Sequence, residues 1–209
     1  MDFLTSSAFA VSAISAIVLF AAIFTFAIFS GKVQLFKSKK GQTENSIDTN
    51  LIKSLKRYAG LRDIQVLGKT KLCFNNETFE FDAIMLSYYG TIAVKSCYEQ
   101  GEIYGEAKDT KWISIDKNGN KTYFANPSSS THGSVKFFKE IYTAEKVKCG
   151  LSEAFVVFPA KDVQLYLGKN ITVYSIKSLE ARLSSDKYQQ DKGADIPAMQ
   201  AALEKYTVK

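Results

Sequence analysis

Three side chains that could take part in chemistry lie close together in the middle of the chain. Asp82 lies in the apolar run 78–87, and Lys95 and Cys97 lie in the next apolar run, 91–97. Lys95 and Cys97 share one face, because alternate residues of a strand point the same way. The short turn between the two runs predicts an antiparallel pair of strands. An isolated buried charge is costly, so Asp82 needs a cation, a metal ion or hydrogen bonds, and Lys95 is placed to supply the cation.

The elements that position these residues follow from hydrophobic periodicity and turn signals. Thr43 and Ser178 could cap two of the helices, and Asn118-Gly119 marks a hairpin. The order of elements predicts an α/β fold with a mixed central sheet flanked by helices. The expected helices are 44–58, 130–146, 178–184 and 195–206, and the expected strands are 62–67, 70–74, 78–87, 91–97, 102–105, 111–116, 121–125, 153–158 and 171–176.

The beginning of the chain differs from the rest. Residues 8–29 contain no charge, and as a helix they would span roughly 33 Å at about 1.5 Å per residue, enough for the core of a bilayer. A cleaved signal peptide would have a basic leader and an apolar run of about 7–15 residues. This run is longer, and Asp2 stands in a leader without Lys or Arg. We expect one N-terminal transmembrane helix before the α/β domain, with a signal peptide or a buried core helix as the alternatives.

The charges beside this segment predict its orientation. Four lysines lie within residues 32–40, and basic flanks stay in the cytoplasm. We therefore expect a transmembrane anchor over 1–30, a basic juxtamembrane linker over 31–42 and the α/β domain over 43–209. The N-terminus would lie outside, and the main domain would be cytoplasmic.

Charge and cysteine content narrow the function classes only a little. The net charge of +6 suits contact with anionic lipid or with nucleic acid, although a solvated lysine-rich surface is the simpler interpretation. The three cysteines are widely spaced and, with the single histidine, form neither a disulfide framework nor a zinc pattern. Tyrosines could line a groove for single-stranded nucleic acid or pack between strands; they are Tyr88, Tyr89, Tyr98 and Tyr104.

An ordered set of residues lies along the chain; it consists of Gly41, Glu44, Asp82, Gly90, Gly101, Ile103, Gly105, Trp112, Asn126-Pro127 and the late strand 154–158. This set resembles the nuclease-related domain (NERD) family, which is grouped with the PD-(D/E)xK nucleases and their restriction-endonuclease-like fold. The resemblance covers roughly residues 41–180 and implies a site in which Asp82 and a strand glutamate hold a divalent metal. It also implies a strand lysine that orients the attacking water.

The sequence departs from the family pattern at the chemistry itself. With the glycines in register, the family's Glu-x-Lys falls on Lys95, Ser96 and Cys97. An ammonium at the glutamate position would repel a divalent cation. We expect Lys95 to point between Asp82 and Glu44 and to neutralise this degenerate catalytic site without any cofactor. The domain would then be catalytically impaired, a binding or interaction module linked to nucleic acid.

The alternative is an active metal-dependent nuclease with relocated acids. Asp82 would hold Mg²⁺ or Mn²⁺ together with Glu99, Glu102 or Glu106. Glu99 lies roughly 13 Å along an ideal strand from Lys95, at about 3.3 Å per residue, so it could join the site only through a bulge. The membrane is the expected partner and nucleic acid a further candidate. The sequence does not distinguish DNA from RNA as the nucleic acid. It also leaves open the protein partners and the oligomeric state.

Overall fold

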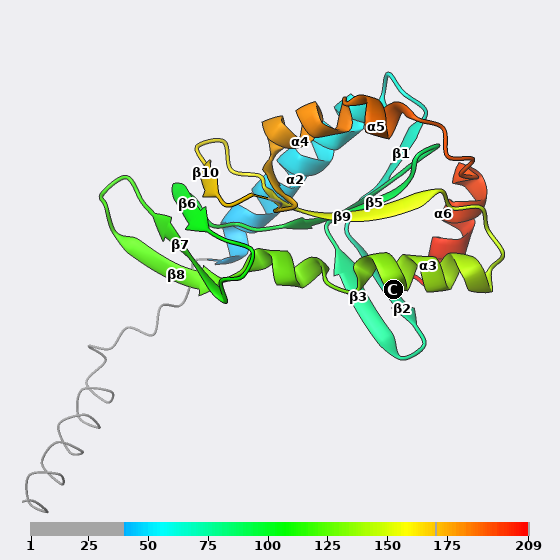
Figure 1. The fold of residues 1–209 in the computed structure, drawn as a ribbon, viewed down its shortest axis with the longest axis horizontal. Helices are drawn as coiled ribbons and strands as arrows, with labels where there is room; N and C mark the ends of the chain where they lie inside the picture. The colour runs from blue at the N-terminus through cyan, green and yellow to red at the C-terminus, as the bar shows by residue number, and fades with distance from the viewer. Residues whose placement is uncertain (1–39, 170, 209) are drawn as a thin grey trace, which may run out of the picture. The chain divides into compact units, whose positions relative to one another are not determined.

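The computed structural model describes residues 40–169 and 171–208, except for the side chains of residues 40–48 (Figure 1). Gln42–Lys209 form one compact unit. The expected transmembrane anchor lies outside the described residues. Within the part of the chain that is described, no helix is both long enough and apolar enough to cross a membrane.

A five-stranded mixed sheet forms the centre of the domain and confirms the predicted mixed α/β class. The strand order is β1–β4–β5–β9–β11, in which β1, β4 and β5 pair antiparallel and β5, β9 and β11 pair parallel. The strands are β1 (Ile64–Leu67), β4 (Ala83–Ser87), β5 (Gly90–Ser96), β9 (Leu151–Phe158) and β11 (Val173–Ser175). The three most central strands are mostly buried, which matches their nearly continuous apolar sequences.

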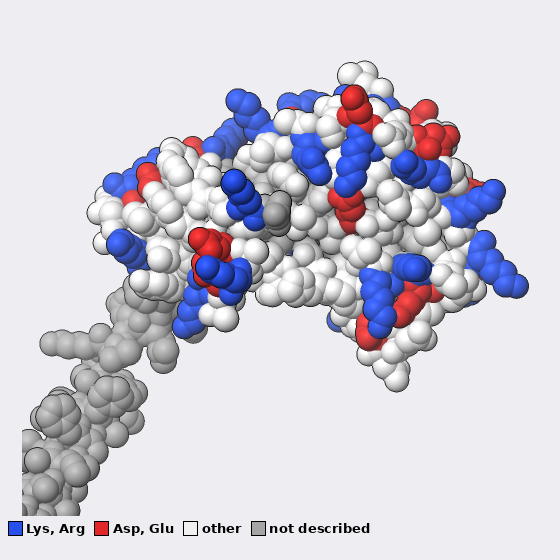
Figure 2. All heavy atoms as spheres, in the orientation of Figure 1, with Lys and Arg blue, Asp and Glu red and all other residues white. Residues whose placement is uncertain are grey.

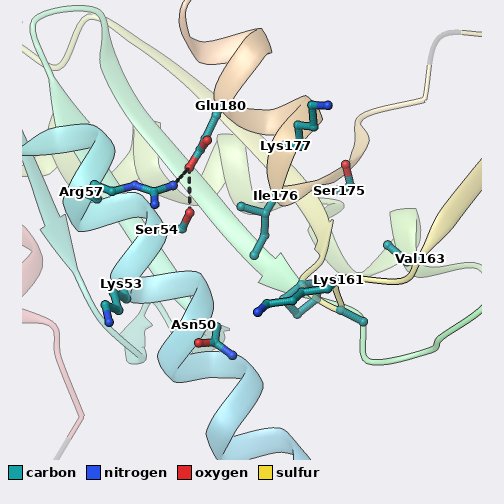
Figure 3. A pocket seen from close by; sticks show the side chains of 12 residues that line it. Asn50, Lys53, Ser54, Arg57, Lys161, Val163, Ser175, Ile176, Lys177 and Glu180 are labelled. Carbon is teal, nitrogen blue, oxygen red and sulfur yellow. Dashed lines mark hydrogen bonds and ion pairs between the residues drawn. The ribbon is translucent and has the colours of Figure 1, made fainter.

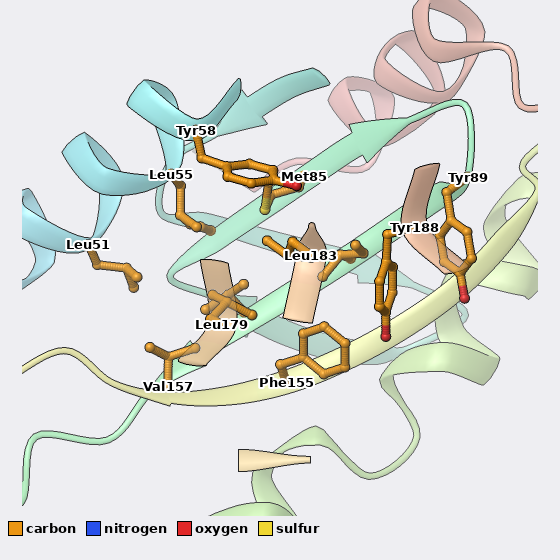
Figure 4. Close-up of a cluster of buried hydrophobic side chains, with 13 residues drawn as sticks. Leu51, Leu55, Tyr58, Met85, Tyr89, Phe155, Val157, Leu179, Leu183 and Tyr188 are labelled. Atoms are coloured by element: carbon orange, nitrogen blue, oxygen red, sulfur yellow. The ribbon is translucent and has the colours of Figure 1, made fainter. Parts of the chain in front are cut away.

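Helices cover both faces of this sheet (Figure 1). One face carries α2 (Lys40–Ala59), α4 (Ile176–Leu183) and the short α5 (Asp186–Gln189), and the other carries α3 (Ser134–Ala144) and α6 (Ile196–Lys205). On the first face, Leu51 and Leu55 are one helical turn apart and pack with Met85 of β4 (Figure 4). Leu179 and Leu183 repeat this spacing on α4. These two apolar stripes fix α2 and α4 over the sheet.

Two smaller sheets are separate from the central one. The expected strands 102–105, 111–116 and 121–125 form a separate four-stranded sheet instead of joining the central sheet. Its order is β10–β6–β7–β8, and a hairpin of two further strands stands apart from both sheets. The bounds are β6 (Glu102–Gly105), β7 (Lys111–Ile115), β8 (Lys121–Ala125), β10 (Gln164–Leu167), β2 (Thr70–Phe74) and β3 (Glu77–Phe81).

Several local expectations are corrected by backbone geometry. The helix expected over 130–146 is a 3₁₀ helix, η1 (Pro127–Thr131), followed by α3. Gly133, with φ of 81°, separates them in a left-handed conformation that suits glycine. Ser175 rather than Ser178 is the N-cap of α4, and Ser178 completes the capping box three residues later. At the first helix, α2 begins at Lys40, so the expected cap Thr43 lies inside it.

Candidate functional site

Asp82 lies where the chain passes from one sheet to another. The run 78–87 was expected to be one strand, but β3 ends at Phe81 and β4 begins at Ala83. β3 pairs with β2, whereas β4 pairs with β1 and β5. The chain therefore bends at Asp82, and the carboxylate lies at the end of the central sheet instead of in the middle of a strand.

Backbone hydrogen bonds hold Asp82 in this bend. Its N–H donates to the carbonyl of Val94 at 3.0 Å, and its Oδ2 accepts the N–H of Ser96 at 2.6 Å. Only 6% of the Asp82 side chain is exposed. A hydrogen bond from an amide to a buried carboxylate favours the charged form, so β5 itself stabilises this acid.

Lys95 supplies the cation that the sequence led us to expect. Its Nζ lies 3.9 Å from Oδ2 of Asp82, and 30% of its side chain is exposed. The distance is too long for a hydrogen bond, so the two groups form an ion pair through space. The charge of Lys95 also reaches Glu80: a hydrogen bond from Lys69 is the main cause that lowers the pKa of Glu80, and Lys95 contributes to the same shift.

Of the remaining sequence-predicted residues, Glu44 lies in α2, but its side chain is outside the described part. Whether Lys95 points between Asp82 and Glu44 therefore stays a prediction. Cys97 is half-buried and packs at the edge of the cluster formed by Trp112 and its neighbours. The structure thus brings Asp82 and Lys95 together and places Cys97 against apolar side chains.

The described side chains around Asp82 do not form the cluster of acids that a divalent metal needs, and the side chain of Glu44 lies outside the described part. Mg²⁺ and Mn²⁺ prefer several oxygen ligands, with carboxylates foremost. Across the residues described, no group of three or more His, Cys, Asp or Glu side chains is arranged to hold a metal ion. The neighbour that Asp82 has on β5 is the ammonium of Lys95, which repels a dication.

Two acids of the alternative site, Glu102 and Glu106, have other partners. The carboxylate of Glu102 accepts a hydrogen bond from Tyr104 at 2.7 Å. Glu106 forms an exposed ion pair with Lys108 at 3.2 Å. Neither joins Asp82 in a described cluster of metal-binding side chains. No observation therefore favours relocation of the site to these residues.

Two of the motif glycines have packing roles. Gly90 has φ of 136°, and a side chain there would collide with the backbone of Leu151 on β9. Gly105 is covered by the indole of Trp112, which leaves no room for a methyl group. The indole N–H donates to the carbonyl of Glu106 at 3.0 Å, and Trp112 is fully buried. Both glycines therefore allow a close approach within a sheet, Gly90 between β5 and β9 and Gly105 between β6 and Trp112 of β7.

Asn126 has a structural role that its sequence position alone did not reveal. Its side-chain amide donates to the carbonyls of Ala107 and Asp109 at 3.2 and 2.8 Å, and its Oδ1 accepts the N–H of Ser128 at 3.0 Å. One buried side chain thus ties the loop after β6 to the start of η1. An Asn-Pro pair before a helix is the sequence signal of such a cap.

The tyrosines expected near the site do not gather in one groove. Tyr89 is buried, and its hydroxyl donates to Glu153, whereas Tyr88 is 47% exposed at the turn between β4 and β5. Tyr104 lies on the four-stranded sheet, where its ring stacks on Tyr166 with centroids 4.8 Å apart. Of these three tyrosines, Tyr104 belongs to an exposed aromatic surface.

That surface is one row of side chains across the four-stranded sheet. Tyr166 lies opposite Tyr104, Tyr104 opposite Ile113, and Ile113 opposite Tyr123. The intervening residues Ile103 and Trp112 point to the buried side. Tyr166 and Tyr123 are 50% and 64% exposed, so the row, here called the tyrosine row, faces solvent.

One comparison with known proteins found a match. Residues 39–159 match the family model of the nuclease-related domain, which is more than half of the chain. Neither the curated proteins nor the solved structures contain a match to the chain. The matched region includes Asp82, Lys95 and the motif glycines, and the chain belongs to the nuclease-related domain (NERD) family.

Proposed function

We propose that this chain is a membrane-anchored NERD protein whose nuclease-type site is closed by an internal ion pair and works without metal. Lys95, at the position of the family's metal-binding glutamate, carries the proposal because its ammonium lies 3.9 Å from Asp82. The lysine neutralises the acid that a metal would otherwise neutralise. The restriction-endonuclease-like framework is then a scaffold for binding and not for hydrolysis.

Electrostatics support this proposal over a catalytic one. At 4 Å, two unit charges interact with about 4 kcal/mol at an effective dielectric constant near 20. This interaction is attractive between Lys95 and Asp82 and would be repulsive between Lys95 and a metal ion. A cation at Asp82 would therefore have to displace Lys95 and lose the ion pair before it gained a ligand.

Nucleic acid is the partner that we propose for the module. The tyrosine row supports this, because bases stack on exposed aromatic side chains without regard to sequence. Lys111 and Lys121 lie on the same side of the sheet as the row, two residues before Ile113 and Tyr123, where they could meet phosphates. On the face shown in Figure 2, lysines and arginines are spread among acids rather than gathered in one stripe. Stacking would thus carry more of the binding than charge.

The membrane is the second partner in the proposal. The uncharged run 8–29 and the four lysines within residues 32–40 support one anchor with a basic linker over 31–42. The charge rule would place residues 43–209 in the cytoplasm, where nucleic acid is accessible.

Metal binding and cleavage test the central part of this proposal. The full-length chain in nonionic detergent would be titrated with MgCl₂ and MnCl₂ by calorimetry, and incubated with plasmid DNA, single-stranded DNA and RNA. We expect no site-specific metal binding and no cleavage above that of the Asp82→Asn variant. Metal binding or cleavage that Asp82→Asn abolishes would overturn the proposal in favour of the relocated nuclease.

A further inference from the structure

A basic cleft lies on the face of the domain that carries α2 and α4. Its volume is about 690 Å³. One wall is α2, and the other is formed by the loop after β9 together with the start of α4 (Figure 3). Neither Asp82 nor Lys95 lines this cleft, so it is a different place from the nuclease-type site. The lining residues are Asn50, Lys53, Ser54, Arg57, Pro159, Ala160, Lys161, Val163, Ser175, Ile176, Lys177 and Glu180.

The wall from α2 is a polar stripe. Asn50, Lys53, Ser54 and Arg57 follow the spacing of one helical face, whereas Leu51 and Leu55 point into the core. Helix α2 is therefore amphipathic, and its polar stripe borders a cleft that is open to solvent. This arrangement places charged side chains along the rim of the cleft.

The charge in the cleft is strongly unbalanced. Four cationic side chains line it against the single carboxylate of Glu180. That carboxylate is already engaged, because its Oε1 accepts hydrogen bonds from Ser54 at 2.7 Å and from Arg57 at 3.3 Å. Among the side chains that the structure describes, none forms an ion pair with the other three cations, and all three are exposed; they are Lys53, Lys161 and Lys177.

The lysines around the cleft come from three separate elements. Lys161 extends from the loop toward α2, whereas the side chains of Lys53 on α2 and Lys177 at the first turn of α4 point outward (Figure 3). The start of a helix carries partial positive charge, which adds to that of the lysines. Lysine binds phosphate as a compact point charge on a flexible stem, so Lys53 and Lys177 would turn toward Lys161 to share one phosphate group.

The cleft also has an apolar side. Pro159, Val163 and Ile176 line it beside the cations, and Ile176 points toward its middle in Figure 3. Pockets for small ligands commonly measure about 300–1,000 Å³ and combine apolar walls with a few polar groups. The combination here suits a ligand with a phosphate at one end and an apolar body at the other.

We propose that this cleft binds a phosphate-bearing small ligand, with Lys53, Lys161 and Lys177 around the phosphate. The body of the ligand would lie against Pro159, Val163 and Ile176. Two sources have this chemistry: a free nucleotide and the headgroup of an anionic phospholipid. The inference does not depend on the state of the Asp82 site, because no residue is shared between the two.

Two binding measurements distinguish the sources. In the first, the full-length chain in nonionic detergent is titrated with AMP and with inorganic phosphate by calorimetry. In the second, the chain is placed in nanodiscs of phosphatidylcholine alone or mixed with phosphatidylglycerol, and its melting temperature is followed by fluorescence of the sole tryptophan, Trp112. AMP binding identifies a nucleotide site, and a higher melting temperature with phosphatidylglycerol identifies a headgroup site.

Variants show whether the effect belongs to the cleft. Lys53→Ala and Lys161→Ala should each weaken AMP binding at least tenfold, or remove the melting shift caused by phosphatidylglycerol. Lys139→Ala is the matched control, because Lys139 is an exposed lysine on α3 and should leave both unchanged. The proposal is wrong if neither probe acts, or if the cleft variants and Lys139→Ala behave alike. Neither result would bear on metal binding at Asp82.

Discussion

Lys95 and Asp82 face each other one residue beyond the end of the ladder between β4 and β5. The last pair of that ladder is Ala83 and Val94, and the next step brings Nζ of Lys95 to 3.9 Å from Oδ2 of Asp82. The same oxygen accepts the N–H of Ser96. A cation and a backbone amide thus act on one carboxylate oxygen of Asp82.

Removal of the lysine should destabilise the domain through Asp82. Lys95→Ala leaves the mostly buried carboxylate of Asp82 without its neighbouring cation. We expect a loss of about 1–2 kcal/mol in the free energy of unfolding, which lies between the values for exposed and for buried ion pairs. Urea unfolding at neutral pH measures it. In an Asp82→Asn background, Lys95→Ala should lower the free energy of unfolding much less. An equal loss in both backgrounds would mean that the ion pair does not contribute to stability.

The contact between Gly105 and Trp112 predicts a steric effect. Gly105→Ala would push a methyl group into the indole, and we expect a loss of about 1–3 kcal/mol with a change in the emission of the sole tryptophan. Gly68→Ala is the matched control, because the space beside Gly68 is open and its backbone is not left-handed. If both variants unfold alike, the indole is not packed against Gly105.

A hydrogen-bonded network around Glu153 predicts a dependence of stability on pH. Burial by itself raises the pKa of Glu153, but hydrogen bonds from Lys187, Tyr89 and Tyr188 outweigh it, and the net pKa lies below the ordinary 4.5. Burial is the main cause that raises the pKa of Tyr89 to about 12, and the hydrogen bond to Glu153 adds to the same shift. The charged carboxylate therefore stabilises the fold.

The sign of this effect follows from the lowered pKa. The contribution of Glu153 is complete above its ordinary pKa and is lost as the pH falls through the lower, folded value. Glu153→Gln should therefore lower the free energy of unfolding at pH 7 by about 1–2 kcal/mol, and by less at pH 3. Urea unfolding of both proteins at the two pH values measures this. A difference that does not shrink in acid would contradict the assignment.

The tyrosine row predicts stacking with single strands. Tyr123→Ala should weaken binding of a fluorescent single-stranded oligonucleotide by about 1–3 kcal/mol, as measured by fluorescence anisotropy. Tyr88→Ala serves as the control, since Tyr88 is exposed at the turn between β4 and β5 and lies outside the row. If the two variants bind equally well, or if the wild type binds no single strand, this face is not a nucleic-acid surface.

Much of the central sheet could be predicted from the sequence, because its apolar runs are long and its turn at Gly90 is marked. The bend at Asp82 could not, since residues 78–81 alternate and residues 83–86 are a continuous apolar run, and a strand can have either pattern; the pairing of β3 with β2 reveals the break. Strand β10 was missed although a signal exists: Leu165 and Leu167 alternate with exposed residues and pack on the Trp112 cluster.

The candidate site could likewise be predicted only in part. Asp82 and Lys95 come from neighbouring strands joined by a tight turn, so local spacing was enough to bring them together. The Glu153 network and the basic cleft join elements that are far apart in sequence, such as α2 and α4. No local sequence pattern predicts such contacts, because they depend on how the helices pack over the sheet.

The most direct test of the account is to return a carboxylate to the position of Lys95. Lys95→Glu would face Asp82 with a second acid, and two carboxylates are ligands that Mn²⁺ prefers. We expect this full-length variant to melt below the wild type without metal and to be stabilised by MnCl₂, whereas the wild type and the control Lys139→Glu are not. Manganese stabilisation of the wild type that disappears in Asp82→Asn, or none in Lys95→Glu, would contradict the claim that Lys95 stands in place of the metal.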